Sequence, residues 1–141
     1  KQNLDDKQYK PNAVYNRTSS AKNGLVGPAE YANDWMIQQE DARSNRPQLG
    51  AIYDAYSKRC FKNGAMDFDD LLIKMYELLK NYPDALSKYQ RKFKYILIDE
   101  YQDTNHLQEA MLRLLSNGKN SFMVGDVKQS IYGCFFFCGS V

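Results

Sequence analysis

The most informative segment of the chain is Tyr95-Ile96-Leu97-Ile98-Asp99-Glu100-Tyr101-Gln102-Asp103. Its first four residues favour a β-strand and show no polar alternation, so the strand is predicted to be buried on both faces. Buried strands of this kind belong to parallel sheets, whose ligands bind beyond the carboxyl ends of the strands. Asp99 and Glu100 stand at that end, which makes them the first candidates for a functional site.

Two adjacent carboxylates at a strand end have the chemistry of a Walker B element, in which the aspartate holds Mg²⁺ and the next acid orients a water. The alternative, that the two acids only cap the following turn, stays open on these residues alone. A second predicted strand, Phe122-Met123-Val124, leads into Gly125-Asp126, and Gln129 follows. Parallel pairing would bring Asp126 and Gln129 to the same sheet edge, where a glutamine amide can contact a γ-phosphate oxygen.

Helices are predicted around these two strands. Asn105 and Gln108 form a capping pair for a helix between the strands, which gives one right-handed, parallel βαβ unit. Apolar spacing upstream predicts helices over 29–43, from Leu49 to about residue 62, over 67–80 and from Pro83, whereas residues 1–27 are predicted to be mostly loop. The expected fold class is therefore α/β, with a mostly helical N-terminal part that leads into a partial parallel sheet.

Composition excludes few classes of protein. The 141 residues are 43% apolar, contain no run long enough to span a bilayer, and begin at Lys1 with a polar stretch that does not resemble a signal peptide. A piece of a longer protein is expected. Three scattered cysteines indicate a reducing compartment. Residues 1–64 carry ten Lys/Arg against seven Asp/Glu, and residues 65–141 carry nine against ten, which favours two solvated surfaces over a basic binding face.

The remaining candidate residues give weaker signals. Tyr132 can stack on a base of single-stranded nucleic acid or lie in the core, and spacing does not separate the two. The single histidine, His106, is expected at the surface, and no Cys/His cluster has the spacing of a zinc site. No Gly-x-x-x-x-Gly-Lys-Ser/Thr loop occurs in the sequence, so this chain alone is expected not to cradle phosphates or hydrolyse ATP.

Two of these segments carry a family resemblance. Residues 98–105 resemble motif II of UvrD/Rep/PcrA-type superfamily 1 DNA helicases, and residues 124–132 resemble their motif III. Residues 19–23, 66–72 and 89–93 also look like this family, so the similarity covers roughly residues 10–132. The Val127-Lys128-Gln129 variant is similar as well to helicase-nuclease subunits of the AddA/RecB type.

The resemblance implies a domain map and partners. Residues 1–64 would be part of the helical accessory subdomain 1B, and residues 65–141 part of the RecA-like motor domain 1A, a P-loop NTPase fold. The cofactors would be ATP and Mg²⁺, and the partners single-stranded and duplex DNA, in the cytoplasm of a bacterium and without a membrane.

The resemblance also implies residue roles. Asp99 and Glu100 would serve Mg²⁺, Glu100 would activate water, and Gln129 would couple the γ-phosphate to DNA. Tyr132 would lie along the single strand, and Lys22 and Asn23 are further candidates for DNA contacts.

The chain departs from the family after Tyr132, where an aromatic and Arg-Gly-Ala are usual. It has Gly133-Cys134-Phe135-Phe136-Phe137-Cys138 instead, and no arginine follows Arg113. We predict a fragment of an ATP-dependent DNA helicase that translocates on single strands and unwinds duplex. The alternatives are the helicase part of a helicase-nuclease and a non-catalytic module that binds DNA or protein.

Overall fold

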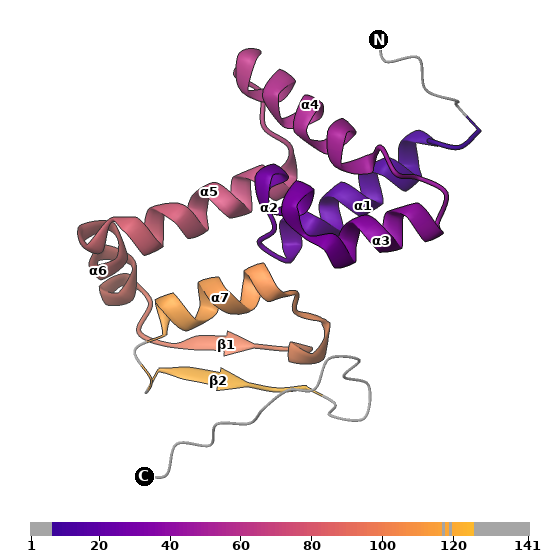
Figure 1. The fold of residues 1–141 in the computed structure, drawn as a ribbon. Coiled ribbons are helices and arrows are strands. Elements are labelled where there is room, and N and C mark those ends of the chain that lie inside the picture. The colour runs from indigo at the N-terminus through magenta and orange to yellow at the C-terminus, as the bar shows by residue number, and fades with distance from the viewer. Residues whose placement is uncertain (1–6, 117, 119, 126–141) are drawn as a thin grey trace. The chain divides into compact units, whose positions relative to one another are not determined.

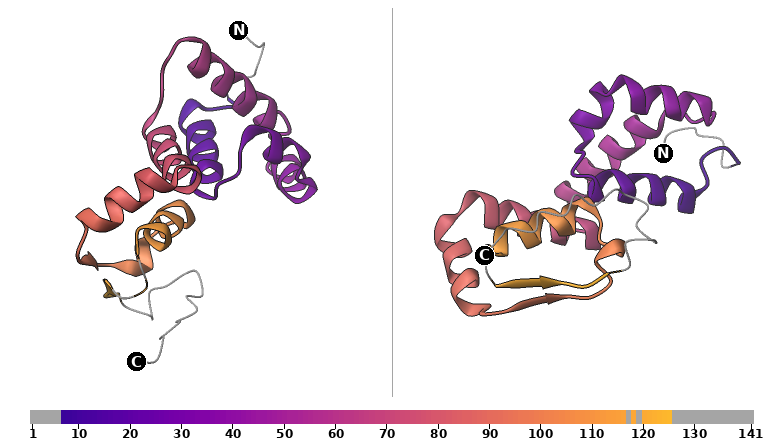
Figure 2. Two further views of the ribbon diagram at one scale, coloured as in Figure 1. Left: turned by 90° about the vertical axis from the view of Figure 1, so that its left-hand side faces the viewer. Right: turned by 90° about the horizontal axis from the view of Figure 1, so that it is seen from below.

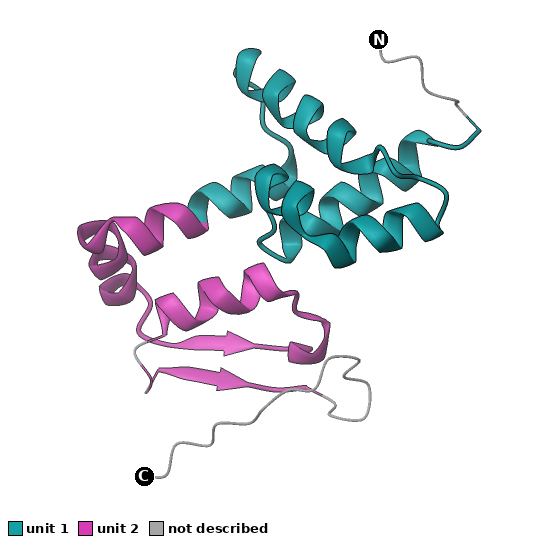
Figure 3. Cartoon of the chain, viewed as in Figure 1, with its two compact units in different colours: residues 1–75 teal, residues 76–141 magenta. Residues whose placement is uncertain are grey.

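The chain forms two compact units, residues 1–75 and 76–141, in a computed structural model that describes residues 7–116, 118 and 120–125 (Figure 3). The described residues are mostly helical and include one small parallel sheet, so the predicted α/β class is confirmed (Figure 1). No helix in the described ranges is long and apolar enough to cross a membrane.

The first unit consists of helices. They are α1 (Pro11–Asn23), α2 (Pro28–Asn33), α3 (Trp35–Arg43), α4 (Leu49–Lys62) and the first part of α5 (Phe68–Asn81). The core lies where α2 meets α4, with the rings of Tyr31 and Tyr53 edge to face at 5.7 Å between centroids. Gly50 permits this close approach, since a Cβ there would lie 3.3 Å from the Tyr31 ring.

A polar network extends this core toward α1. Asp41 is 1% exposed and accepts hydrogen bonds from the Tyr31 hydroxyl at 2.6 Å and from Arg17 Nε at 3.1 Å. Burial and the hydrogen bond to Asp41 raise the pKa of Tyr31 to about 12, against a smaller opposing effect of Arg17. Buried carboxylates are tolerated only when they are paired in this way.

The prediction of a loop over residues 1–27 is wrong, because α1 occupies thirteen of these residues. An apolar stripe is missing from α1 since its buried residues are Thr18 and Lys22, at a helical spacing of four. Apolar periodicity therefore could not reveal a helix that packs through polar side chains.

The predicted helix over 29–43 is two helices. Asp34 interrupts it with an extended backbone (φ −82°, ψ 107°) and caps α3 by accepting hydrogen bonds from the amides of Met36 and Ile37. Trp35 and Met36 are 66% and 60% exposed, so the apolar pattern did not mark the buried side of this segment.

The second unit contains the sheet. After the end of α5 come α6 (Pro83–Lys92), β1 (Ile96–Ile98), the 3₁₀ turn η1 (Tyr101–Asp103), α7 (His106–Leu115) and β2 (Ser121–Met123). The strands pair in parallel with Leu97 opposite Phe122, which confirms the predicted strand-helix-strand order and parallel pairing. Figures 1 and 2 show α7 along one side of both strands. Leu79 and Leu107 are fully buried among the described residues of this unit.

The prediction that the first strand is buried on both faces is wrong for the described residues. Leu97 is 78% exposed and its partner Phe122 is 64% exposed, whereas Ile96 and Ile98, which face the other way, are half-buried. Alternate residues of a strand point to opposite faces, so one face of this two-stranded sheet is uncovered within the described ranges.

Candidate functional site

The two candidate carboxylates directly follow β1, as predicted. Both side chains are exposed, and Asp99 Oδ1 accepts a hydrogen bond from the Glu100 amide at 2.9 Å. The carboxylates are therefore presented beyond the carboxyl end of the strand, where ligands of parallel sheets bind.

The backbone at Glu100 is left-handed (φ 51°, ψ 43°). Such a conformation places Cβ close to the following carbonyl and is unfavourable for a residue other than glycine by roughly 1–2 kcal/mol. The turn is held by the Asp103 amide, which donates to the Glu100 carbonyl at 2.9 Å. Strained residues of this kind cluster at functional sites, so the conformation adds weight to Glu100 as a candidate.

The second strand ends beside this turn. The Val124 amide donates to the Ile98 carbonyl at 2.8 Å, and the Tyr101 amide donates to the Val124 carbonyl at 3.0 Å. At Gly125 a Cβ would lie 3.2 Å from the amide nitrogens of Tyr101 and Gln102, and 2.5 Å from Gln102 Oε1, which is the end of a flexible side chain. The chain thus leaves β2 in close contact with the turn that carries Glu100, and a larger residue at position 125 would require the turn to shift slightly.

The structure confirms that both strands end at the same sheet edge. Asp126 comes one residue after Gly125, but Asp126, Gln129 and Tyr132 lie outside the described residues. Their predicted places next to Asp99 and Glu100 therefore stay predictions.

A support for the turn was not expected from the sequence. The Tyr101 hydroxyl donates to Glu109 Oε1 of α7 at 3.2 Å, and Arg113 Nη2 donates to the same oxygen at 2.6 Å. The hydrogen bond from Arg113, and a smaller one from Tyr101, keep the pKa of Glu109 below its usual value. The four-residue spacing of Glu109 and Arg113 was the only signal in the sequence, and it does not single out Tyr101.

The predicted cap of α7 is confirmed. Asn105 Oδ1 accepts from the Gln108 amide at 2.9 Å, and Gln108 Oε1 accepts from the Asn105 amide at 3.1 Å. His106, next to this cap, is exposed as expected. The turn after β1 is therefore fixed at both ends, by the sheet and by a capped helix.

The side chains of Asp99 and Glu100 can be compared with the ligands that a metal ion requires. The described residues contain no group of three or more His, Cys, Asp or Glu side chains able to hold a metal. Mg²⁺ does not need such a cage, because it commonly binds through one or two carboxylates and the phosphates of its substrate. Asp99 and Glu100 fit that requirement, being exposed and adjacent at a strand end.

Lys22 and Asn23 lie in the first unit, in contact with carboxylates. Lys22 is 3% exposed, and its Nζ is 2.6 Å from Asp67 Oδ2 and 2.7 Å from Asp70 Oδ1. Burial alone would lower the pKa of Lys22, but the hydrogen bonds to Asp67 and Asp70 outweigh it and leave the pKa above its usual value. Asn23 Nδ2 donates to Asp69 Oδ1 at 3.3 Å. The predicted DNA contacts of both residues stay predictions.

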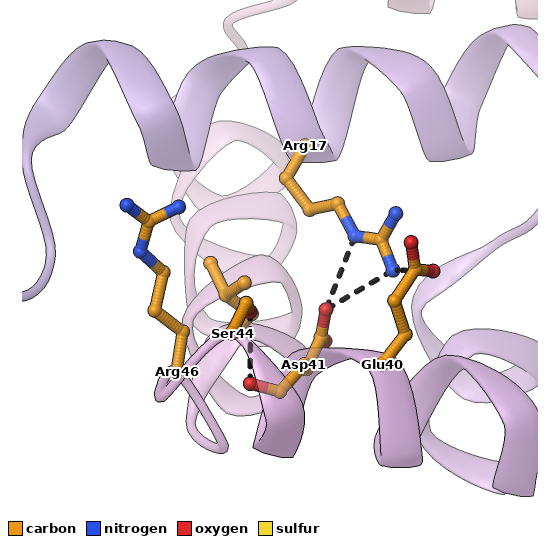
Figure 4. A pocket seen from close by; sticks show the side chains of 6 residues that line it. Arg17, Glu40, Asp41, Ser44 and Arg46 are labelled. Atoms are coloured by element: carbon orange, nitrogen blue, oxygen red, sulfur yellow. Dashed lines mark hydrogen bonds and ion pairs between the residues drawn. The ribbon is translucent and has the colours of Figure 1, made fainter.

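The first unit also has a pocket of about 180 Å³ between α1, α3 and α4. Figure 4 shows Arg17 and Arg46 extending toward it, with Glu40 and Asp41 beside Arg17. Arg17 Nη2 is 2.7 Å from Glu40 Oε2 and 3.1 Å from Asp41 Oδ1. The two acids balance the two guanidinium groups, so the pocket has no charge excess that would select an anion.

Comparisons with known proteins identify relatives of the whole chain. The sequence model of the UvrD/REP helicase N-terminal domain matches residues 1–135. The chain is 39% identical over 134 residues to the ATP-dependent DNA helicase PcrA of Leuconostoc citreum, covering 93% of this chain and 17% of that protein. It is 38% identical over 133 residues to the PcrA of Staphylococcus aureus strain Mu50, with 94% and 17% covered. The chain thus spans about a sixth of the length of these relatives.

Proposed function

This chain belongs to the UvrD/REP helicase family, within the N-terminal domain of that family, and we propose that it forms part of an ATP-driven motor that moves along DNA. The relatives described above are named ATP-dependent DNA helicase PcrA. In the proposed motor, ATP hydrolysis drives translocation on single strands and the unwinding of duplex. Because the relatives are not named as helicase-nucleases, the helicase-nuclease alternative is not favoured.

One observation carries the proposal. Asp99 and Glu100 follow a parallel strand directly, and the neighbouring strand leaves the sheet against the same turn through Gly125. A nucleotidase needs carboxylates at such an edge, because the phosphates and the metal ion lie beyond the carboxyl ends of the strands. The turn is held on two sides, which supports the accurate placement that catalysis requires.

The roles follow from the chemistry of the side chains. When bound, Mg²⁺ neutralises charge on the β- and γ-phosphates. Asp99 would hold the ion directly or through water, and Glu100 would accept a proton from the attacking water and orient it. We further propose that Gln129 contacts the γ-phosphate and that Tyr132 stacks along single-stranded DNA.

The domain map is part of the proposal. The first 64 residues would belong to a helical accessory subdomain, and residues 65–141 to a RecA-like domain of the P-loop NTPase type. The boundary between the compact units falls inside α5, after residue 75. Asn23 is kept as a proposed DNA contact of the accessory part, and a DNA contact of Lys22 is the alternative against which the inference below is tested.

The chain on its own is proposed to be inactive. No phosphate-binding Gly-x-x-x-x-Gly-Lys-Ser/Thr loop occurs in its 141 residues, so ATP would lack its main cradle. Purified chain mixed with single-stranded DNA, ATP and Mg²⁺ is expected to release no phosphate above the buffer rate. Hydrolysis stimulated by DNA would contradict this part of the proposal.

The role of Asp99 is tested by Asp99→Asn in the full-length parent protein. Removal of one charge from a metal site is expected to raise the Mg²⁺ concentration for half-maximal ATP hydrolysis about 10- to 100-fold. Asp103→Asn is the matched control, because Asp103 is an exposed carboxylate in the same turn. An unchanged Mg²⁺ dependence in Asp99→Asn would remove the metal-binding role.

A further inference from the structure

Two sequence segments that the proposed ATPase chemistry does not use meet in the first unit. They are residues 19–23, at the end of α1, and residues 66–72, which include the start of α5. Lys22 comes from the first segment and forms ion pairs with Asp67 and Asp70 from the second, at 2.6 and 2.7 Å. The pairing joins positions that are more than forty residues apart in the chain.

Helix α4 supplies a third member. The Tyr56 hydroxyl donates to Asp67 Oδ2 at 2.8 Å, and Lys22 Nζ lies 5.2 Å from the centroid of the Tyr56 ring. The ammonium group thus contacts two carboxylates and an aromatic face, which is favourable for a desolvated cation. We call Lys22, Tyr56, Asp67 and Asp70 the Lys22 cluster.

The same carboxylates also begin α5. The Asp70 amide donates to Asp67 Oδ1 at 2.8 Å, and the Asp67 amide donates to Asp70 Oδ2 at 3.1 Å. This reciprocal cap uses one oxygen of each carboxylate, and Lys22 binds the other oxygen of each. The first turn of α5 and the end of α1 are therefore fixed by one set of atoms.

The cluster depends on the lysine for its charge balance. Asp69 follows in the same turn, is 9% exposed and receives a hydrogen bond from Asn23, while its Oδ2 has no partner among the described residues. Lys22 thus lies within ion-pair distance of both Asp67 and Asp70, next to the buried carboxylate of Asp69. Removing it would take away the ammonium group that pairs with Asp67 and Asp70, while three aspartates stay close together at one helix start.

The Lys22 cluster lies at the start of α5, the helix that connects the two units. Helix α5 is one uninterrupted helix of 14 residues that begins in the first unit and ends in the second. A helix rises about 1.5 Å per residue, so α5 extends roughly 20 Å along the chain. What fixes its first turn therefore also fixes the start of the connection between the two units.

We propose that Lys22 is a positioning residue that anchors the start of α5 to α1 and α4, and that in the complete motor it links DNA binding to ATP turnover through α5 instead of touching DNA itself. The anchoring stands on the contacts above, whereas the link to turnover rests on the proposed motor function.

The competing role, a direct contact of Lys22 with a DNA phosphate, makes an opposite prediction for one variant. Asp67→Asn keeps the capping oxygen but removes a negative charge beside Lys22. If Lys22 binds phosphate, this change frees the ammonium and strengthens DNA binding. If Lys22 anchors α5, Asp67→Asn weakens the anchor, as Lys22→Met does.

The experiment uses the full-length parent protein with the variants Lys22→Met, Lys22→Arg, Asp67→Asn and Tyr56→Phe. Lys58→Met is the control, because Lys58 is a lysine of α4 that is 76% exposed and pairs only locally with Asp54. Hydrogen exchange of the amides over residues 67–72 reports the anchor. The concentration of a single-stranded oligonucleotide at half-maximal ATP hydrolysis, together with kcat, reports the link to turnover.

We expect Lys22→Met and Asp67→Asn to speed exchange over residues 67–72 by about tenfold or more, and Tyr56→Phe by less. Both should raise the half-maximal DNA concentration, Lys22→Arg should recover most of the loss, and Lys58→Met should match the wild type. Tyr56→Phe removes only a hydroxyl and keeps the test valid if Lys22→Met fails to fold.

Weaker DNA stimulation in Lys22→Met with stronger stimulation in Asp67→Asn would overturn the inference in favour of a DNA contact. Unchanged exchange in all four variants would overturn the anchor. If the wild-type parent shows no ATP hydrolysis stimulated by DNA, the proposed function fails, and the exchange data still decide whether Lys22 anchors α5.

Discussion

At the scale of single residues, Glu100 combines a candidate catalytic carboxylate with an unfavourable backbone. Its left-handed φ of 51° is one of three positive values at residues other than glycine in the described ranges. The hydrogen bonds within the turn, and the one from the turn to the end of β2, hold this conformation in place. The side chain is therefore positioned at a cost to stability, as is common where function and folding compete.

Replacing Glu100 by glycine should expose that cost. Glu100→Gly relieves the Cβ clash and is expected to exceed Glu100→Ala in free energy of unfolding by about 1 kcal/mol. Both variants lose the carboxylate, so the difference between them isolates the backbone. Urea unfolding of the two variants measures it, and equal stabilities would mean that Glu100 does not hold this conformation in solution.

The Lys22 cluster predicts a pH dependence. Burial tends to raise the pKa of Asp67, but the hydrogen bond from Lys22 and others outweigh it and lower the pKa. A depressed folded pKa contributes stability above the unfolded value of about 3.9, and this is lost as the pH falls through the folded pKa. Lys22, Tyr56 and Asp70 contact Asp67.

The wild-type chain should therefore lose stability on acidification below about pH 4, and Asp67→Asn should lose less over the same interval. Lys22 acts in the other direction, because its raised pKa gives stability that is lost only at strongly alkaline pH. Urea midpoints between pH 2.5 and 6 for both chains provide the comparison. If the urea midpoints of the wild type and Asp67→Asn fall equally on acidification, Asp67 is not paired in the folded state.

At the scale of elements, helix ends explain part of what sequence patterns predicted. Gly64 follows α4 in the left-handed region with φ 61°, close to the predicted end of this helix at about residue 62. Leu25 takes the corresponding place after α1, with φ 60°, although Gly24 stands one residue earlier. A leucine there gives no stop signal, which helps explain why α1 was missed.

The two helix ends should both be more stable with glycine than with alanine. Leu25→Gly should exceed Leu25→Ala in free energy of unfolding by about 0.5–1 kcal/mol, because both lose the half-buried leucine side chain and only glycine adopts the left-handed region without a Cβ penalty. Gly64→Ala should lower it by about 1 kcal/mol, through backbone strain alone, since no atom lies within 4 Å of the new Cβ. Thermal unfolding of the three variants is the measurement, and a glycine no more stabilising than alanine at either position would contradict the assigned helix ends.

The two faces of the sheet should respond differently to mutation. Leu107 of α7 is 0% exposed, so Leu107→Ala is expected to cost about 2–5 kcal/mol. Leu97 is 78% exposed on the uncovered face, so Leu97→Ala should change stability by about 0.5 kcal/mol or less. Chemical denaturation of the isolated chain compares them, and a large loss in Leu97→Ala would mean that this face is covered in solution.

At the scale of the whole molecule, the sequence predicted those parts that follow apolar periodicity and capping. Helices α4, α5 and α7 and the parallel strand pair appear where the patterns placed them. Polar packing hid α1, and a capping aspartate at residue 34 split a helix that looked continuous. The strands are less buried than predicted. An apolar strand sequence is suited to contacts on both faces, but it does not show whether other segments cover both faces.

The candidate site was predicted equally unevenly. The sequence located Asp99 and Glu100 at a sheet edge, because strand ends and acidic pairs are visible in a linear pattern. The left-handed Glu100, the close approach at Gly125 and the Tyr101–Glu109–Arg113 support depend on contacts in space, which a linear pattern does not contain.

The central claim is that the carboxylate of Glu100 activates water for ATP hydrolysis in the parent motor. The most direct test is the rate of ATP hydrolysis by full-length Glu100→Gln with saturating single-stranded DNA, alongside its affinity for nucleotide. Loss of a general base is expected to slow turnover by about 10²- to 10⁴-fold while nucleotide affinity stays within a few-fold of wild type. Turnover close to the wild-type rate would contradict the account.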